Sequence, residues 1–220
     1  MRERWATFDC YGTLIDWETG IGTELERLLG PSGGELLHRY HELEPRVQEQ
    51  RPDASYREVM AAVLEQLAAE RGIALPDHER DALGRSLPGW PPFPDTAPGL
   101  TEAKRRGWRL AALSNTDPDF LAASERAIGV PFDARIVASE IGSYKPAHRH
   151  WTAFWERTGA DRSRHVHVAQ SQFHDIVPAA ELGLPSIWIN RLGDDRLQQP
   201  TRELPDLTRL ADVLDELVPA

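Results

Sequence analysis

Polar side chains follow four short apolar runs of the sequence, close to the points where those runs end. They are two carboxylates, a hydroxyl and a lysine: Asp9, Ser114, Lys145 and Asp175. In an open parallel sheet, ligands bind at the carboxyl ends of the strands, so residues that follow successive strands meet at one edge. Carboxylates, hydroxyls and lysines are the groups that act as nucleophiles and acid–base catalysts. The set therefore predicts a reactive, ligand-binding site at one edge of a sheet.

The apolar runs have the length of buried strands, four to six residues. They cover residues 5–8, 108–113, 134–138, 165–169 and 185–189. Between the last four runs lie segments with helical spacing, at about 117–128, 147–158 and 174–183, and a glycine lies at or just past the end of each. Alternation of strand and helix is typical of a parallel α/β sheet.

Residues 16–94 lack this alternation and show helical periodicity. The candidate helices cover about 19–30, 35–50, 55–71 and 77–87. Pro45 lies inside the second of them and predicts a kink or break there. The proline-rich segment 88–95 predicts a linker that returns to the sheet. We therefore expect an α/β domain of residues 1–15 and 95–220, with a helical domain of residues 16–94 inserted after the first strand.

The 220-residue chain has a net charge of −10 and a single cysteine. A surface for nucleic acid or anionic membranes needs an excess of basic side chains, so we expect neither partner. One cysteine excludes an internal disulfide and a zinc site built from several thiolates. The first residues lack the long apolar region of a signal peptide, and no stretch approaches the roughly 18 apolar residues that cross a bilayer. We therefore expect a cytoplasmic protein.

His165 and His167 alternate on one predicted strand. Two histidines at this spacing can bind a metal ion, but the sequence offers no clear third ligand. We therefore expect no metal site at this pair.

The four motifs, in this order after successive strands, resemble those of the haloacid dehalogenase superfamily over essentially the whole chain. The loop of Asp9, Gly12 and Thr13 resembles the nucleophile motif of that family, and Ser114 resembles its second motif. Lys145, followed by a proline, resembles the third motif, and Asp175 the acidic fourth. The resemblance implies a hydrolase with a Rossmann-like parallel sheet, helices on both faces, and the inserted helices as a cap over the site.

Tyr11 indicates the branch of the family. Phosphatases of the superfamily usually carry an Asp two residues after the nucleophile, where it protonates the leaving alcohol and binds magnesium through its carbonyl group. Tyrosine has no carboxyl proton to donate, and a halide leaving group needs none. The sequence from Asp9 to Leu14 is similar to that of L-2-haloacid dehalogenases, which implies an (S)-2-haloacid dehalogenase without metal or cofactor. A phosphatase that depends on Mg²⁺ is the alternative.

The resemblance also implies a role for each residue of the site. Asp9 attacks the halogen-bearing carbon and forms an aspartyl ester, which water then hydrolyses to release a 2-hydroxy acid. Lys145 keeps Asp9 ionised, and Asp175 orients Lys145. Thr13 and Ser114 hold the carboxylate of the substrate, a small anionic organic acid.

Three further residues are expected to contact the substrate or the departing halide. Arg39 matches the cap arginine that helps to bind the halide in this group, and Asn115 matches the amide that assists it. Tyr11 is expected beside the substrate. The resemblance also makes a homodimer formed through the cap plausible.

The fourth motif departs from the pattern of this branch. Gln170 and Gln172 stand where a serine and an asparagine position the hydrolytic water, and His174 stands where a pocket aromatic is usual. His174 can serve as a general base or simply pack and form hydrogen bonds. Dehalogenation with a different selectivity, another displacement at carbon such as the opening of a strained ring acid, and a catalytically weak binding protein therefore remain alternatives.

Overall fold

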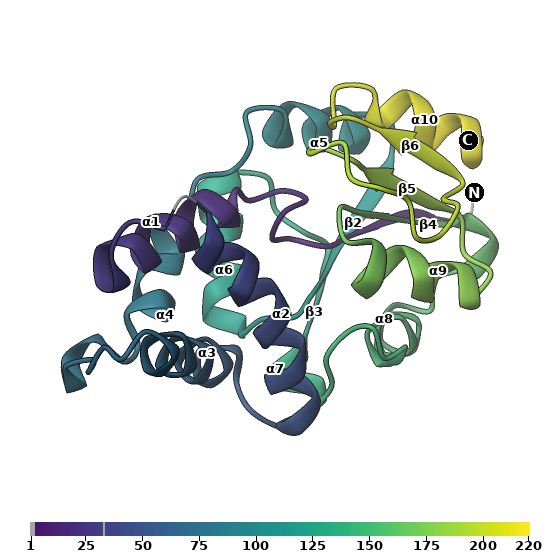
Figure 1. The fold of residues 1–220 in the computed structure, drawn as a ribbon. Helices are drawn as coiled ribbons and strands as arrows, with labels where there is room; N and C mark the ends of the chain where they lie inside the picture. The colour runs from purple at the N-terminus through teal and green to yellow at the C-terminus, as the bar shows by residue number, and fades with distance from the viewer. Residues whose placement is uncertain (1–2, 33) are drawn as a thin grey trace.

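The computed structural model describes residues 3–32 and 34–220. Its centre is a six-stranded parallel sheet with the order β3-β2-β1-β4-β5-β6 (Figure 1). The strands are β1 (Arg4–Phe8), β2 (Trp108–Ser114), β3 (Ala134–Val137), β4 (His165–Ala169), β5 (Ser186–Ile189) and β6 (Arg202–Leu204). All five apolar runs form strands, so the predicted parallel α/β fold is confirmed. The sequence did not mark β6 because it is three residues long and two of them are exposed.

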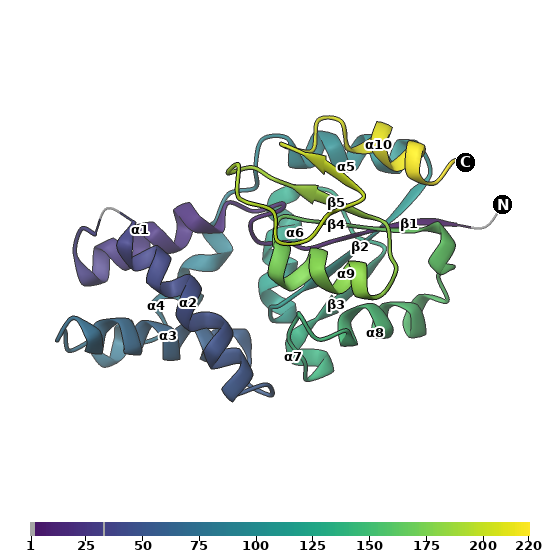
Figure 2. The ribbon, with the colours of Figure 1, turned by 45° about the vertical axis from the view of Figure 1, so that its right-hand side comes forward.

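Helices cover both faces of the sheet (Figures 1 and 2). They are α5 (Thr96–Arg105), α6 (Pro118–Ile128), α7 (Ala138–Ile141), α8 (Arg149–Thr158), α9 (Val177–Glu181) and α10 (Leu210–Leu217). Successive residues of a strand point to opposite faces. On β2, Leu110 and Ala112 therefore join the core cluster that includes α5, α6 and α10. Ala111 and Leu113 join a second cluster that includes α8 and α9.

The segment between β1 and α5 is helical, as predicted, and stands to one side of the sheet (Figure 2). Its helices are α1 (Trp17–Leu29), α2 (Glu35–Gln50), α3 (Tyr56–Glu70) and α4 (Ala82–Ser86). The expected break at Pro45 is wrong, because α2 continues through this residue; a proline removes only one backbone donor from the helix. The expected helix at 77–87 is divided instead: Asp81 lies outside helical geometry and separates a short 3₁₀ turn from α4.

The chain passes between the sheet and this helical segment twice, and the two crossings lie side by side. Ile15 forms a β-bridge with Pro92, and the Phe93 N–H donates to the Leu14 carbonyl at 3.0 Å. The Asp16 N–H donates to the carbonyl of the residue before Pro92. We propose that these paired crossings separate the domain of residues 1–15 and 95–220 from the cap of residues 16–94.

A second contact fixes the start of α3 over the sheet. The Asp117 carboxylate, at the end of the loop after β2, accepts the backbone N–H groups of Tyr56 and Arg57 at 2.9 and 3.1 Å. These are unpaired donors of the first helical turn, where a negative charge is favourable. The Tyr144 hydroxyl also donates to the Ala54 carbonyl at 2.8 Å. The cap is thus attached to the sheet edge as well as to its own connecting segments.

Candidate active site

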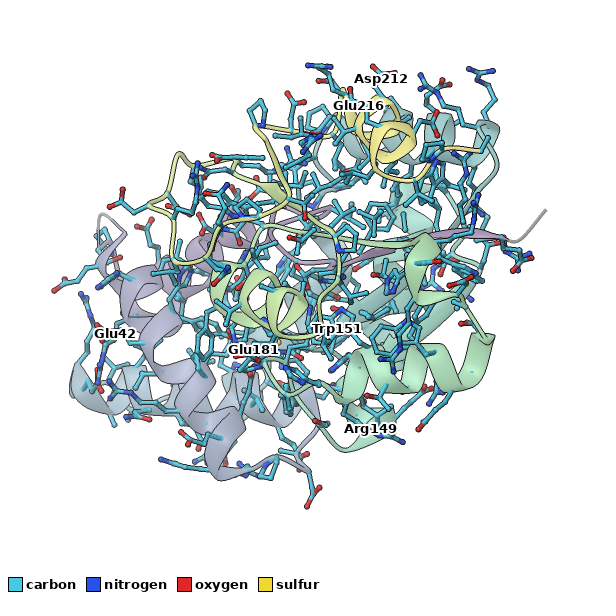
Figure 3. All side chains as sticks on the ribbon, turned by 90° about the vertical axis from the view of Figure 1, so that its right-hand side faces the viewer. Glu42, Arg149, Trp151, Glu181, Asp212 and Glu216 are labelled. Carbon is cyan, nitrogen blue, oxygen red and sulfur yellow. The ribbon has the colours of Figure 1, made fainter. Side chains whose placement is uncertain are left out.

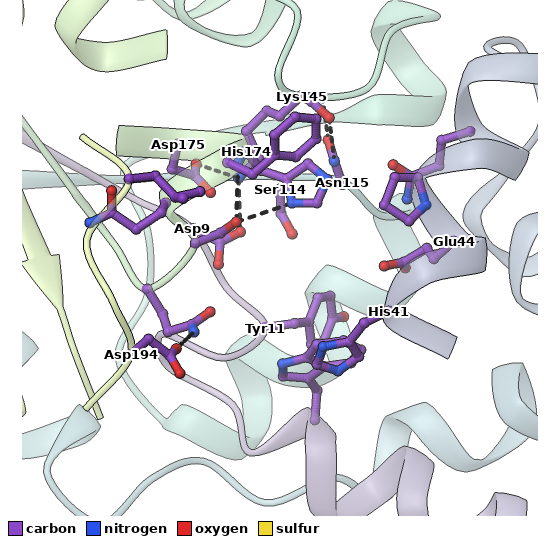
Figure 4. Close-up of a pocket in the computed structure, with 18 of the residues that line it drawn as sticks. Asp9, Tyr11, His41, Glu44, Ser114, Asn115, Lys145, His174, Asp175 and Asp194 are labelled. Carbon is purple, nitrogen blue, oxygen red and sulfur yellow. Dashed lines mark hydrogen bonds and ion pairs between the residues drawn. The ribbon is translucent and has the colours of Figure 1, made fainter. Parts of the chain in front are cut away.

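Asp9 lies directly after β1, at the carboxyl edge of the sheet, and is 7% exposed. Its Oδ1 accepts a hydrogen bond from Lys145 Nζ at 2.8 Å (Figure 4). Its Oδ2 accepts one from Thr13 Oγ1 at 2.9 Å. Gly12 turns the chain with a φ of +88°, and a Cβ at this position would lie 3.0 Å from the Trp17 indole nitrogen. A tight loop therefore holds both carboxylate oxygens on hydrogen-bond donors.

Lys145 lies in the loop that follows α7, and its ammonium group is fully buried. Nζ donates to Asp9 Oδ1, to Asp175 Oδ1 at 2.7 Å and to the Leu113 carbonyl at 2.9 Å. Burial lowers the pKa of Lys145, but the two carboxylates raise it more, and the net change is upward. Lys145 is therefore a fixed cation. All three of its ammonium protons are used, so it has none left for a ligand.

Asp175 lies in a π-helical turn, Gln172–Ile176, that follows β4. Its Oδ1 accepts from Lys145 and from His167 Nε2 at 2.9 Å, whereas its Oδ2 is buried without a hydrogen-bond partner. Burial raises the pKa of Asp175, but the Lys145 ammonium and the His167 hydrogen bond bring it below the ordinary value. The carboxylate thus stays ionised and keeps one oxygen open.

The pKa of Asp9 moves in the opposite direction. Burial raises it by more than the Lys145 ammonium lowers it, and the charge of Asp175 raises it further. Of the two carboxylates that share Lys145, Asp9 is therefore the more basic. A carboxyl group can act as a nucleophile only in its ionised form, so a nucleophilic role of Asp9 would strengthen as the pH rises through its pKa.

Ser114 and Asn115 end β2 next to Lys145. The Ser114 hydroxyl is buried and has no hydrogen-bond partner. Asn115 Oδ1 accepts from the Lys145 backbone N–H at 2.7 Å, and its Nδ2 donates to the Lys145 carbonyl at 3.0 Å. Asn115 therefore fixes the backbone of Lys145 from both sides, and Ser114 keeps a hydroxyl free for a ligand.

Tyr11 forms part of the wall of the site. Its hydroxyl lies 3.2 Å from Ser124 Oγ, and its ring stacks on Tyr56 and meets the edge of Trp90. Burial raises the pKa of Tyr11 well above its ordinary value of 10.0. Tyr11 therefore lines the cavity described below and holds its proton firmly.

The three residues of the altered fourth motif lie at the site but differ in their contacts. The Gln170 backbone N–H donates to Thr13 Oγ1 at 2.9 Å. Gln172 Oε1 accepts from a backbone N–H of the loop at residue 198, and its Nε2 is buried without a partner. His174 Nδ1 lies 3.1 Å from Ser171 Oγ, and its Nε2 is also buried without a partner. Gln172 and His174 thus each keep one polar atom available.

A cavity of about 640 Å³ lies between the sheet edge and α2, and Asp9 is part of its wall. All of the predicted site residues line it except Thr13, which lies behind Asp9, and Arg39. Sequence reasoning missed several lining residues: Trp17, His41, Glu44, Pro45, Gln48, Tyr56, Asp194, Asp195 and Leu197. Four of them follow the spacing i, i+3, i+4, i+7 along α2, which marks a single helix face. This spacing was the signal that could have identified them.

The structure does not place Arg39 at the cavity, where the predicted halide-binding role would need it. Its guanidinium pairs with Glu70 at 2.7 Å and with Glu42 at 2.6 Å, and the side chain is 34% exposed. Glu42 lies at the outer edge of the helices in Figure 3. Arg39 precedes the cavity-lining His41 by two residues, and two residues rotate a helix by about 200°. Arg39 therefore points away from the cavity face of α2.

The charges on the cavity wall are mostly acidic. Glu44 is buried there, and its Oε1 accepts from the Tyr56 hydroxyl at 2.8 Å. Burial raises the pKa of Glu44 to about 7, although the Tyr56 hydrogen bond lowers it. Asp194 and Asp195 line the outer part, and among the described lining residues Lys145 is the sole lysine or arginine. An anionic ligand must therefore rely on neutral donors.

A metal site is not evident in the part of the chain that the structure describes. No group of three or more His, Cys, Asp and Glu side chains is arranged there so that it could hold an ion. His165 and His167, the pair considered in the sequence, both face a threonine hydroxyl.

Comparison with known proteins relates the whole of this architecture to one family. Residues 4–183 match the family model of the haloacid dehalogenase-like hydrolases. The (S)-2-haloacid dehalogenase of Pseudomonas sp. (strain YL) is 28% identical over 217 residues, which are 94% of this chain and 93% of that protein. The glyceraldehyde 3-phosphate phosphatase of Methanothermobacter thermautotrophicus is 31% identical, but over only 45% of each chain.

Solved structures share the fold along nearly the full length. A crystal structure of an L-2-haloacid dehalogenase has a TM-score of 0.87 at 22% identity and covers 98% of this chain and 100% of that one. The L-2-haloacid dehalogenase of Xanthobacter autotrophicus with chloropropionic acid covalently bound has a TM-score of 0.86 at 19% identity, with 96% and 98% covered. At these identities the likeness shows the fold.

Proposed function

The chain belongs to the haloacid dehalogenase-like hydrolases, and we propose that it converts (S)-2-haloacids into 2-hydroxy acids and halide. The observation that carries this proposal is Tyr11, two residues after the nucleophile. Its hydroxyl is bound to Ser124 and retains its proton, so this position supplies no acid for an alcohol leaving group. A halide departs without a proton. The likeness to an (S)-2-haloacid dehalogenase over 94% of the chain supports the same substrate class.

In the first step, a carboxylate oxygen of Asp9 attacks C2 of the haloacid from the side opposite the halogen. The new bond joins this oxygen to C2 while the carbon–halogen bond breaks, and the halide leaves with the bonding electrons. The product is an aspartyl ester with the carbon inverted. Lys145 and Thr13 hold Asp9 for this attack, and the cap shields the carboxylate from water.

In the second step, water attacks the carbonyl carbon of the Asp9 ester and the bond from that carbon to the substrate oxygen breaks. The 2-hydroxy acid leaves with the oxygen that Asp9 supplied, and Asp9 keeps the water oxygen. The water must lose a proton to a nearby base, and this base then returns the proton to the oxygen of the departing 2-hydroxy acid. Asp175 Oδ2 and His174 Nε2 are two buried polar atoms without a partner that fit this role, His174 in the tautomer that carries its proton on Nδ1.

The substrate carboxylate needs hydrogen-bond donors other than Lys145, whose three protons are already used. The free Ser114 hydroxyl is one such donor, and the second proton of Asn115 Nδ2 is another. Both residues lie at the end of β2 beside Asp9. We therefore assign the carboxylate to Ser114 and Asn115 and the hydrocarbon part of the substrate to the wall formed by Tyr11.

Ion release separates dehalogenation from the phosphatase alternative. Purified protein is incubated with (S)- and (R)-2-chloropropionate and with a panel of phosphate esters, with and without EDTA, and chloride and phosphate are measured together. We expect chloride from the (S) acid alone, unchanged by EDTA. Phosphate release that is lost on chelation would instead identify the magnesium-dependent phosphatase.

Asp9→Asn provides the negative control for this assay, because the amide is a much weaker nucleophile. It should release no chloride once deamidation has been excluded by mass spectrometry. Asp77→Asn is the matched control, since the Asp77 side chain is 95% exposed and far in sequence from the motifs. It should keep the full rate.

The proposed chemistry requires no cofactor, since each step uses only Asp9, its neighbours and water. The partner is a small anionic acid. In the described part of the chain, no helix has the length and apolar character needed to span a membrane. The cytoplasmic location and the homodimer stay predictions.

A further inference from the structure

A chain of buried hydrogen bonds leads from helix α8 to the active site. Trp155 Nε1 lies 3.1 Å from His165 Nδ1, and His165 Nε2 lies 2.7 Å from Thr7 Oγ1. Thr7 Oγ1 lies 2.8 Å from His167 Nδ1, and His167 Nε2 lies 2.9 Å from Asp175 Oδ1. The three middle residues meet because Thr7 on β1 pairs with His167 on β4, and His165 lies two residues earlier on the same face.

The direction of every bond in this chain follows from its first member. The indole nitrogen of Trp155 can only donate, so His165 Nδ1 must accept. His165 then carries its proton on Nε2 and donates to Thr7 Oγ1. The Thr7 hydroxyl has one proton, which it gives to His167 Nδ1. His167 therefore carries its proton on Nε2 and donates it to Asp175.

A proton on His167 Nδ1 would cost this arrangement a hydrogen bond. Thr7 Oγ1 would then accept from both histidines, and the Thr7 proton would lose its acceptor in the chain. The neutral His167 tautomer with its proton on Nδ1 would also place the Nε2 lone pair against Asp175 Oδ1.

The surroundings of His167 are closed and contain few charges. Asp175 is the anion in contact with it, and the Lys145 ammonium lies on the other side of Asp175 Oδ1. The titratable groups His150 and His165 also face it, and burial lowers the pKa of each to about 3, so both are neutral. The Trp151 ring covers it at a centroid distance of 5.1 Å.

We propose that Trp155, His165 and Thr7 form a positioning relay that keeps Nδ1 of His167 as a hydrogen-bond acceptor and directs its Nε2–H at Asp175. Oδ1 of Asp175 then receives two donors, from His167 and Lys145, and the carboxylate plane is fixed with Oδ2 left open. The importance of that open oxygen for water rests on the proposed function. The relay itself does not, since it is a property of the resting protein.

The protonation of the two histidines can be measured directly by NMR of protein labelled with ¹⁵N-histidine. Long-range ¹H–¹⁵N spectra distinguish the two neutral tautomers and the cation. We expect both His165 and His167 to carry a proton on Nε2 and none on Nδ1 at neutral pH. A His167 that is cationic or protonated on Nδ1 at neutral pH would overturn the proposal.

Trp155→Phe removes the fixed donor, and Trp151→Phe is its matched control. Trp151 is on the same helix, is fully buried, and its indole nitrogen has no hydrogen-bond partner (Figure 3). In Trp155→Phe, His165 Nδ1 is free to carry the proton and the chain can reverse. His167 should then lose its pure Nε2–H state. Trp151→Phe should keep the wild-type tautomers.

The pH profile of turnover gives a second measurement. Trp155→Phe should change the pH profile of kcat, and Trp151→Phe should keep the wild-type profile, because loss of the His167 Nε2–H hydrogen bond changes the field at Asp175. If Trp155→Phe retains the wild-type tautomers and profile, the relay is refuted even though chloride release continues. If no chloride is released by wild type but the tautomers are as expected, the dehalogenase proposal fails and the relay stands.

Discussion

At the scale of single residues, the site divides into groups with satisfied hydrogen bonds and groups that remain open. Lys145 and both oxygens of Asp9 are fully engaged with one another and with Thr13. Ser114 Oγ, Gln172 Nε2, His174 Nε2 and Asp175 Oδ2 are buried without partners. Buried polar atoms are rarely left unpaired unless a ligand or water meets them. The open set therefore outlines where substrate and water bind.

His174→Phe tests whether His174 accepts a proton during hydrolysis of the ester. Phenylalanine keeps an aromatic ring but removes the free Nε2. Ester hydrolysis should slow by about a hundredfold or more, while ester formation is little changed. Halide release should then show a rapid burst equal to the enzyme concentration, followed by slow turnover. Mass spectrometry should detect the ester on Asp9.

Ser171→Ala is the companion variant, because it removes the partner of His174 Nδ1 and leaves Nε2 in place. The Asp9 ester should accumulate in this variant too, but to a smaller extent than in His174→Phe. Full turnover in His174→Phe would show that His174 only packs, and Asp175 would then be the base.

Glu44 predicts a pH dependence of substrate binding. Its pKa is raised to about 7 by burial, so it is neutral below that pH and anionic above it. An anionic haloacid is repelled by the charged form, and KM should rise as the pH passes through 7. An increase of about tenfold between pH 6 and pH 8 is reasonable for a charge in a poorly solvated cavity.

Glu44→Gln should make KM nearly independent of pH over this range, because the amide does not titrate. Glu49→Gln, an exposed position of the same helix, is the control and should behave as wild type. An unchanged KM profile in Glu44→Gln would mean that this side chain does not face the bound acid.

At the scale of elements, the positions of the strands were easier to predict from the sequence than the orientation of the cap helices. Each apolar run ends at the sheet edge, so the positions of Asp9, Ser114 and Asp175 followed from the parallel order alone. The face that α2 turns to the cavity depends on tertiary packing, and the motif resemblance selected Arg39 instead of His41. The π-helical turn was also not foreseeable, although such turns are frequent at functional sites.

The orientation of α2 gives a direct test. Arg39→Gln should leave kcat and KM within about twofold of wild type, as is usual for a surface substitution. His41→Ala should raise KM, since His41 lines the cavity and stacks on Trp17 at a centroid distance of 4.8 Å. Steady-state halide release measures both. A large loss in Arg39→Gln together with a silent His41→Ala would require the cap to adopt another orientation during turnover.

At the scale of the whole molecule, the two faces of the parallel sheet carry different kinds of side chain. One face carries the apolar residues of the larger core cluster. The other carries Thr7, His165 and His167 between the tryptophans of α8, and this polar relay ends at the active site. Alternation along β4 could be seen in the sequence. The contact of both histidines with the same threonine could not be seen there, because it depends on the register between β1 and β4.

The net charge of −10 did not reveal the character of the site, since charge counts average over the surface. At the centre, one buried cation pairs with two carboxylates, and the cavity wall contains further acidic side chains. Substrate binding must therefore come from local neutral donors. Composition could not show how a small anion is held.

The central claim is that Asp9 forms the covalent ester and supplies the oxygen of the product. A single turnover with enzyme in excess over (S)-2-chloropropionate, in water labelled with heavy oxygen, tests it most directly. The account predicts that the 2-hydroxy acid carries no label and that the peptide containing Asp9 gains it. Labelled product from this first turnover, with an unlabelled Asp9, would show that water attacks the substrate directly and would contradict the account.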